Sequence, residues 1–258
     1  NYSGNAVSVA LDVSSSDRSV NSGYKSQKTG FAIGTDFEQY QNIYLSPMLT
    51  ASYEEIDPET NASAQIKKMD GNYTNLDFSY GIAIDKRNQV YQPTQGYRTK
   101  FVQSLPIVAD SSSVMNGIDI SSYYTVTDDI IGSIKFYARS MHGLEDEDVR
   151  LTSRLFLPQR RLRGFNTRKV GPKDGDSYVG GNYTTALGLE AQLPHLLPES
   201  TRTDISIFFD SGNVWHVDYS DTLDDSNKIR SSIGVSANVW TTVGPLSLTL
   251  ARIISKAT

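Results

Sequence analysis

Apolar and polar residues alternate with a period of two along most of the chain. In the clearest stretch the apolar residues are Leu76, Phe78, Tyr80, Ile82 and Ile84. The residues between them are small, polar or acidic. Successive residues of a β-strand point to opposite faces, so this stretch predicts a strand with one apolar face and one polar face.

Stretches of this kind predict about eleven strands. They lie near residues 6–14, 28–39, 43–55, 73–86, 97–107, 117–127, 132–142, 183–193, 202–217, 229–241 and 245–254. Most reach the roughly 9–11 residues that a tilted membrane-spanning strand needs, whereas soluble strands average about 5–6 residues. The expected fold is therefore all-β: an antiparallel up-and-down transmembrane β-barrel.

The predicted connections alternate in length. One set is short, at 40–42, 87–96, 128–131, 194–201 and 242–244. The other set is longer and polar, at 15–27, 56–72, 108–116, 143–182 and 218–228. Short periplasmic turns and long outer loops are typical of an up-and-down barrel in the outer membrane. The alternative is a soluble all-β domain with uneven loops.

Composition narrows the choice of function. The chain has 258 residues, no cysteine and a formal net charge of −5. These values exclude a disulfide scaffold and a thiolate metal site, and they give no basic surface for nucleic acid. No apolar run approaches the roughly 20 residues of a membrane helix. A polar average does not argue against a barrel, because only every second residue of its strands faces lipid.

The titratable residues do not suggest catalysis. His142, His195 and His216 are far apart in the sequence, and no pair has the spacing of a metal site. Asp210 and His216 lie on one predicted strand, about 20 Å apart at the rise of a strand, which is too far for a catalytic dyad. We therefore expect no bound metal, no cofactor and no enzymatic activity.

The segment 143–182 differs from the rest of the chain. It is about forty residues long with little periodicity, and loops of this length in a compact fold are usually functional or disordered. After an acidic start it becomes basic, and it carries Leu162-Arg163-Gly164-Phe165, Gly171-Pro172 and Gly180-Gly181. The next predicted strand carries Glu190, and the one after it carries a motif that begins at Phe208, includes Asp210 and Gly212, and ends at Trp215.

In order and spacing, these motifs resemble the sixth extracellular loop and the two following strands of the BamA-type outer-membrane assembly factors. That family belongs to a superfamily of outer-membrane insertases and bacterial surface antigens. The turn between Asp85 and Arg98 resembles the mid-barrel turn of the same family. The resemblance covers roughly residues 73–254, and residues 1–72 match only in strand pattern.

The resemblance implies that the long loop folds back into the barrel as a lid. Its motif Leu162, Arg163, Gly164 and Phe165 would then place Arg163 against Glu190 and Asp210 on the inner wall. Gly171, Pro172, Gly180, Gly181 and Gly212 would support the loop and its turns. The strand pattern independently points both carboxylates inward, and a planar guanidinium suits such a pair. The alternative is that both acids only line a wet lumen, with Arg163 in a solvated loop.

The resemblance also implies a function. Residues 1–258 would be a partial barrel in the bacterial outer membrane, with about eleven of an expected sixteen strands. Periplasmic modules and the terminal gate strands would be absent from this segment. Such a barrel folds and inserts client β-barrel proteins. Its expected partners are the lipid bilayer, unfolded clients and periplasmic accessory lipoproteins, with no nucleic acid. The alternatives are a related two-partner-type secretion translocator and a passive outer-membrane channel.

Overall fold

The structure is a computed structural model of the chain. It describes residues 7–20, 23–60, 62–194, 196–223, 225, 228–242 and 244–256, without the side chains of 7–20, 199, 240 and 245. None of the helices in these ranges is long and apolar enough to cross a membrane.

Within the described ranges, eleven strands form one antiparallel sheet. They are β1 (Val7–Val20), β2 (Tyr24–Tyr40), β3 (Ile43–Pro58), β4 (Gly71–Asp85), β5 (Gly96–Ala109), β6 (Ser113–Thr127), β7 (Ile130–Gly143), β10 (Tyr183–Leu193), β11 (Thr203–Trp215), β12 (Arg230–Thr241) and β13 (Gly244–Ser255). Each strand pairs with its neighbours in sequence, and β1 and β13 form the two edges.

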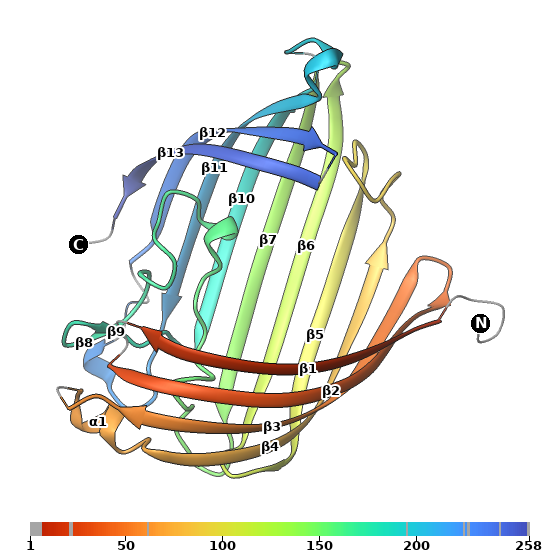
Figure 1. Ribbon diagram of the computed structural model, residues 1–258. Coiled ribbons are helices and arrows are strands. Elements are labelled where there is room, and N and C mark those ends of the chain that lie inside the picture. Colours follow the sequence, from red (N-terminus) through yellow and green to blue (C-terminus); the bar gives the residue numbers. More distant parts are fainter. Residues whose placement is uncertain are drawn as a thin grey trace.

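The smaller elements lie in the connections. They are the helix α1 (Ala64–Lys67), the hairpin β8 (Lys173–Asp174) and β9 (Ser177–Tyr178), and three 3-10 turns at Gln159–Arg161, Glu199–Thr201 and Asp221–Leu223. Figure 1 shows the sheet curling around an interior, with the green segment between β7 and β10 lying inside the curve. We call residues 144–182 the lid, and the end of the sheet where they begin the lid end.

The predicted strands are confirmed in number and order, but two predicted loops are wrong in length. β1 continues through Val20 and β2 starts at Tyr24, and these two residues pair, so most of the expected loop at 15–27 is strand. The expected loop at 108–116 is also short, since β5 ends at Ala109 and β6 begins at Ser113. Residues 21–22 lie outside the described ranges. The polar ends of these strands lack the apolar alternation, yet backbone pairing does not require it.

Rows of apolar residues run across the outer face of the sheet. One row pairs Ile33, Leu49, Phe78 and Leu105 across β2 to β5. A second row pairs Ile134, Leu189, Phe209 and Ile233 across β7 and β10 to β12. Ile33 and Ile134 are 47% and 54% exposed. A continuous apolar band is unfavourable in water but favourable against hydrocarbon, so we call this side the lipid face and the other side the lumen face.

Aromatic rings gather where the lipid face reaches the lid end. The ring of Tyr183 stacks on Trp215 with their centroids 5.7 Å apart. The Tyr183 hydroxyl lies 2.9 Å from Nε2 of His142, and the His216 ring is 5.5 Å from the Tyr183 ring. Rings with a polar tip are typical of the boundary between hydrocarbon and water, so this cluster marks one border of the membrane band.

The apolar core lies in two places. At the lid end, Tyr24, Ile56, Ile66, Leu151, Val179 and Val217 form a buried cluster that joins β2, β3, α1, the lid and the connection 216–229. Inside the curve, Leu157, Leu162 and Val170 of the lid pack on Ala186 of β10 and Val214 of β11. The second cluster attaches the lid to the lumen face, where the functional candidates lie.

Candidate functional site

Arg163 of the lid meets Asp210 of β11 through one edge of the guanidinium group, in a bidentate contact. Its Nε donates to Oδ2 at 2.7 Å and its Nη2 donates to Oδ1 at 2.8 Å. The backbone N–H of Arg163 also donates to Oδ2, at 3.0 Å. Asp210 is only 2% exposed, so its charge is removed from water and needs this partner. The fork geometry is one that lysine cannot reproduce.

Glu190 of β10, the second expected partner, lies farther from Arg163. The distance from Nη1 of Arg163 to Oε2 of Glu190 is 3.8 Å, within ion-pair range but not a hydrogen bond. Lys135 of β7 bonds the same carboxylate oxygen at 2.8 Å, and the hydroxyl of Ser206 donates to the other at 2.7 Å. The structure therefore brings Arg163, Glu190 and Asp210 together, with Asp210 as the main partner of the arginine.

Lys135 is a site residue that the sequence analysis missed. It stands between Ile134 and Phe136 in the alternating pattern of its strand, and this position predicts a side chain on the lumen face. An inward lysine one strand away from an inward glutamate is a signal that could have found the pair.

Phe208 of β11 is a second residue that was missed. The guanidinium carbon of Arg163 lies 3.5 Å from the centre of its ring, in a cation–π contact. A Cβ on Gly234 would lie 2.6 Å from Cζ of this ring, so the absence of a side chain on β12 leaves space for it. Phe208 is 1% exposed, and its position in the alternation of β11 puts its side chain on the lumen face. A bulky aromatic at an inward position is the signal that could have found it.

The other members of the motif hold the lid in place. Leu162 is 2% exposed within the inner cluster, and Phe165 packs against that cluster. Gly164 has a φ of +90°, and a Cβ there would come within 3.0 Å of Cβ of Ala251 on β13. The carbonyl of Arg163 accepts a hydrogen bond of 2.6 Å from the hydroxyl of Ser232 on β12. The tip of the lid therefore contacts the last three strands of the sheet.

The supporting residues lie along the same path. Gly171 has a φ of +110° and passes so close to β11 that a Cβ would lie 2.8 Å from Cβ of Val214. Pro172 beside it is fully buried. Gly181, which follows Gly180, forms a two-way backbone bridge with Leu155, at 2.8 and 3.0 Å. At Gly212 a Cβ would lie 3.0 Å from Leu157, so the wall is hollowed where the lid packs.

Three further lid arginines pair with acids from other elements. Arg150 lies 3.9 Å from Glu54 of β3, Arg154 bonds Asp218 in the connection 216–229, and Arg161 bonds Asp119 of β6. Arg154 is completely buried, and Asp218 also accepts from the backbone N–H of Val149 at 2.6 Å. Asp119 is shared with Arg139 of β7, and both arginines lie over the ring of Tyr137. The lid is thus held by charge pairs along its length.

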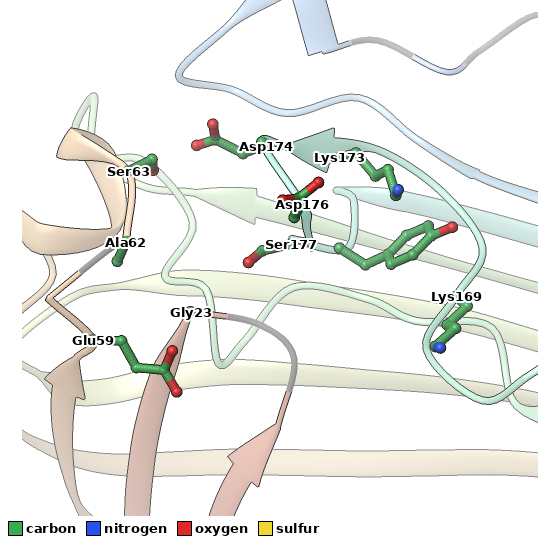
Figure 2. A pocket seen from close by; sticks show the side chains of 11 residues that line it. Gly23, Glu59, Ala62, Ser63, Lys169, Lys173, Asp174, Asp176 and Ser177 are labelled. Carbon is green, nitrogen blue, oxygen red and sulfur yellow. The ribbon is translucent and has the colours of Figure 1, made fainter.

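A cavity of about 730 Å³ opens at the lid end. Figure 2 shows its lining, which carries the carboxylates of Glu59, Asp174 and Asp176 and the ammonium groups of Lys169 and Lys173. Beside it the hydroxyl of Tyr219 donates to Asp174 at 3.2 Å. Burial, together with the charge of Asp174, raises the pKa of Tyr219 above its ordinary value, so this hydroxyl stays protonated.

Among the described residues, no group of three or more histidine, aspartate or glutamate side chains could hold a metal ion. His142 and His216 both contact Tyr183 in the aromatic cluster, and His195 lies outside the described ranges. Asp210, the acid that the sequence analysis compared with His216, has both carboxylate oxygens bonded to Arg163. We call the contacts of Arg163 with Asp210 and Glu190 the Arg163 lock, because they join the lid to the lumen face of the sheet.

Comparisons with known proteins agree with this architecture. The family model described as the Omp85 superfamily domain matches residues 1–258. The chain is similar to the outer membrane protein assembly factor BamA of Neorickettsia risticii (strain Illinois), with 25% identity over 238 residues, which cover 90% of this chain and 32% of that protein. It is also similar to the sorting and assembly machinery component 50 homolog of Homo sapiens, with 25% identity over 172 residues, covering 62% of this chain and 36% of that protein.

The fold also matches a solved structure. The crystal structure of BamA from Haemophilus ducreyi lacking POTRA domains 1–3 superimposes with a TM-score of 0.85 at 19% identity, covering 98% of this chain and 56% of that one. The chain spans about a third of the length of the curated relatives it matches. The predicted all-β barrel fold, the outer-membrane location and the relation to BamA-type assembly factors are confirmed. Because the family model matches the whole chain, the chain belongs to the Omp85 superfamily.

Proposed function

We propose that this chain is the barrel part of an outer-membrane assembly factor that folds and inserts client β-barrel proteins. The observation that carries the proposal is the lid locked to the lumen face by Arg163 and Asp210, at 2.7 and 2.8 Å. The same sheet is similar to two curated proteins whose names describe membrane protein assembly or sorting. A general porin needs no such pair, since its lumen has to stay open to solutes.

The mechanism we propose is not enzymatic. Client strands would add to an edge of the complete barrel by main-chain hydrogen bonds, a mode of recognition that gives affinity without strict demands on sequence. The apolar lipid face holds the barrel in the bilayer, and the lid keeps the lumen filled while strands exchange at the edge. Unfolded client barrels are the substrates, and periplasmic accessory lipoproteins are the expected partners. No cofactor takes part in this scheme.

Reconstitution of the full-length protein that contains this chain would test the proposal. The protein is placed in liposomes, an unfolded small client barrel is added, and folding is followed by the shift of its band on a semi-native gel. Faster folding than in liposomes with an unrelated barrel of similar size is the expected result. The Arg163→Ala variant should lose part of that acceleration, while Lys169→Ala, an exposed lid residue, should keep it.

A different outcome would point to the alternative function. If the client folds no faster than in the control liposomes, and one exported protein instead crosses the bilayer, the chain is part of a two-partner-type secretion translocator. Passage of small solutes without either activity would indicate a passive channel. Both outcomes reject the assembly proposal.

A further inference from the structure

A small cavity lies between the lid and the inner wall, beside the Arg163 lock. It has a volume of about 60 Å³ and is lined by four cations and two carboxylates: Lys135, Arg160, Arg161, Arg163, Glu190 and Asp210. The lining therefore carries an excess of two positive charges. Buried charges in proteins are normally paired, because the loss of hydration is costly without a partner.

The two carboxylates are already engaged. Both oxygens of Asp210 bond Arg163, and Glu190 bonds Lys135 and Ser206. Their negative charges thus balance Lys135 and Arg163, and the excess charge belongs to the other two cations of the lining, Arg160 and Arg161.

Arg161 and Arg160 are less well satisfied. Arg161 bonds Asp119, but that aspartate is shared with Arg139. The Nε atom of Arg161 is buried and has no hydrogen-bond partner in the structure. Arg160 is exposed, but it lines the cavity and forms no ion pair with a carboxylate among the described residues. A buried guanidinium N–H without an acceptor is destabilising, so an acceptor in the cavity would stabilise the docked lid.

The size and access of the cavity limit what that acceptor can be. One water needs about 10–15 Å³ of such space, so the cavity has room for about four waters or for one small anion. Arg160, Arg163 and Glu190 also line a larger luminal cavity of about 630 Å³, which reaches β12 and β13. Solutes from the lumen can therefore reach the smaller cavity past Arg160.

We propose that this cavity is a binding site for a small inorganic anion, chloride or inorganic phosphate, held by Arg160 and Arg161. The anion accepts from the buried Nε of Arg161 and neutralises part of the excess positive charge. Because two of the lining arginines flank the Arg163 lock, a bound anion joins lid residues 160–163 to the wall more firmly. The stability of the docked lid then depends on the kind of anion in solution.

Crystals of the full-length protein soaked in sodium bromide test the site directly. The expected result is an anomalous peak within hydrogen-bonding distance of Nε of Arg161. Density for water alone, in bromide and in phosphate soaks alike, would overturn the proposal. A tetrahedral peak in phosphate with none in bromide would assign the site to phosphate.

Thermal unfolding in detergent tests the consequence. The full-length protein is compared in sodium chloride, sodium phosphate and sodium gluconate at equal ionic strength, since a ligand bound only by the folded state raises stability with its concentration. Chloride or phosphate should raise the unfolding temperature above its value in gluconate. The Arg160→Gln variant should lose most of this rise. Arg160 is exposed and outside the Arg163 lock, so the variant should still fold.

Lys169→Gln is the matched control, because it removes a positive charge from the same lid but lines the other cavity. It should keep the full dependence on anion type. Equal stability in all three salts, or equal losses in both variants, would show only general screening of charge and would reject the site.

Discussion

The side chains of Arg163 and Asp210 lie edge to edge, with two parallel hydrogen bonds of 2.7 and 2.8 Å between a lid guanidinium and a wall carboxylate. The carboxylate is 2% exposed, so it cannot regain water when its partner is removed. Breaking a buried pair by deleting one member typically costs about 3–5 kcal/mol.

Arg163→Ala should therefore strongly lower the temperature at which the folded band is lost on a semi-native gel. For Arg163→Lys this temperature should lie between those of Arg163→Ala and the wild type, because a lysine keeps the charge but not the two paired hydrogen bonds. Lys169→Ala serves as the control and should behave as wild type. An unchanged band for Arg163→Ala would show that this contact does not stabilise the barrel.

The two acids of the site should differ in importance. Asp210→Asn removes the charge that faces two guanidinium nitrogens, whereas Glu190→Gln leaves Lys135, whose side chain is 33% exposed, able to turn to water. We expect a loss of about 2–3 kcal/mol for the first variant and about 1 kcal/mol for the second, as for charged hydrogen bonds of different burial. Urea unfolding in detergent measures both. A larger loss for Glu190→Gln would contradict the ranking of the two partners.

Phe208 and Phe209 provide a matched pair of neighbours on β11. Phe208 faces the lumen under Arg163, and Phe209 pairs across the lipid face with Leu189 and Ile233. Phe208→Leu removes the ring beneath the guanidinium and should cost about 1–2 kcal/mol, whereas Phe209→Leu keeps an apolar group in lipid and should cost less. Heat resistance of the folded band compares the two variants. Equal losses would mean that the ring matters only for packing.

Gly164 should not tolerate a side chain. Its φ of +90° and the 3.0 Å approach to Cβ of Ala251 predict that Gly164→Ala lowers stability through both backbone strain and a clash. Gly175 has a φ of +61° with open space around it, so the loss of stability in Gly175→Ala measures backbone strain without a clash. Adding Ala251→Gly to Gly164→Ala should restore the part of the loss that comes from the clash. No recovery in the double variant would place the whole effect in the backbone.

Much of the fold could be predicted from alternation, because lipid selects the residues on one face of every strand. The same rule fails where strands leave the bilayer, and for that reason β1 and β2 extend through segments that the pattern assigned to a loop. Strand pairing there depends on backbone groups, which every residue carries.

The site was predictable only in part. The alternation of residues along β10 and β11 placed Glu190 and Asp210 on the lumen face. The arginine that binds them lies in an aperiodic loop, so only the family resemblance identified it as their partner. Phe208 and Lys135 also stand at inward positions of their strands, but a strand pattern does not show which inward side chains contact one another. That depends on how the lid crosses the interior, which no local sequence pattern determines.

The lid contacts described above have a consequence for the order of folding. Thr152 binds Glu54, 98 residues earlier, while Arg163 binds Asp210, 47 residues later, and Ser232, 69 residues later. The lid cannot complete these contacts until strands from both halves of the sheet are in place. Contacts of such long range form slowly, since chain entropy is lost before they form. Docking of the lid is therefore a late step, and the Arg163 lock closes only on a sheet whose register is already correct.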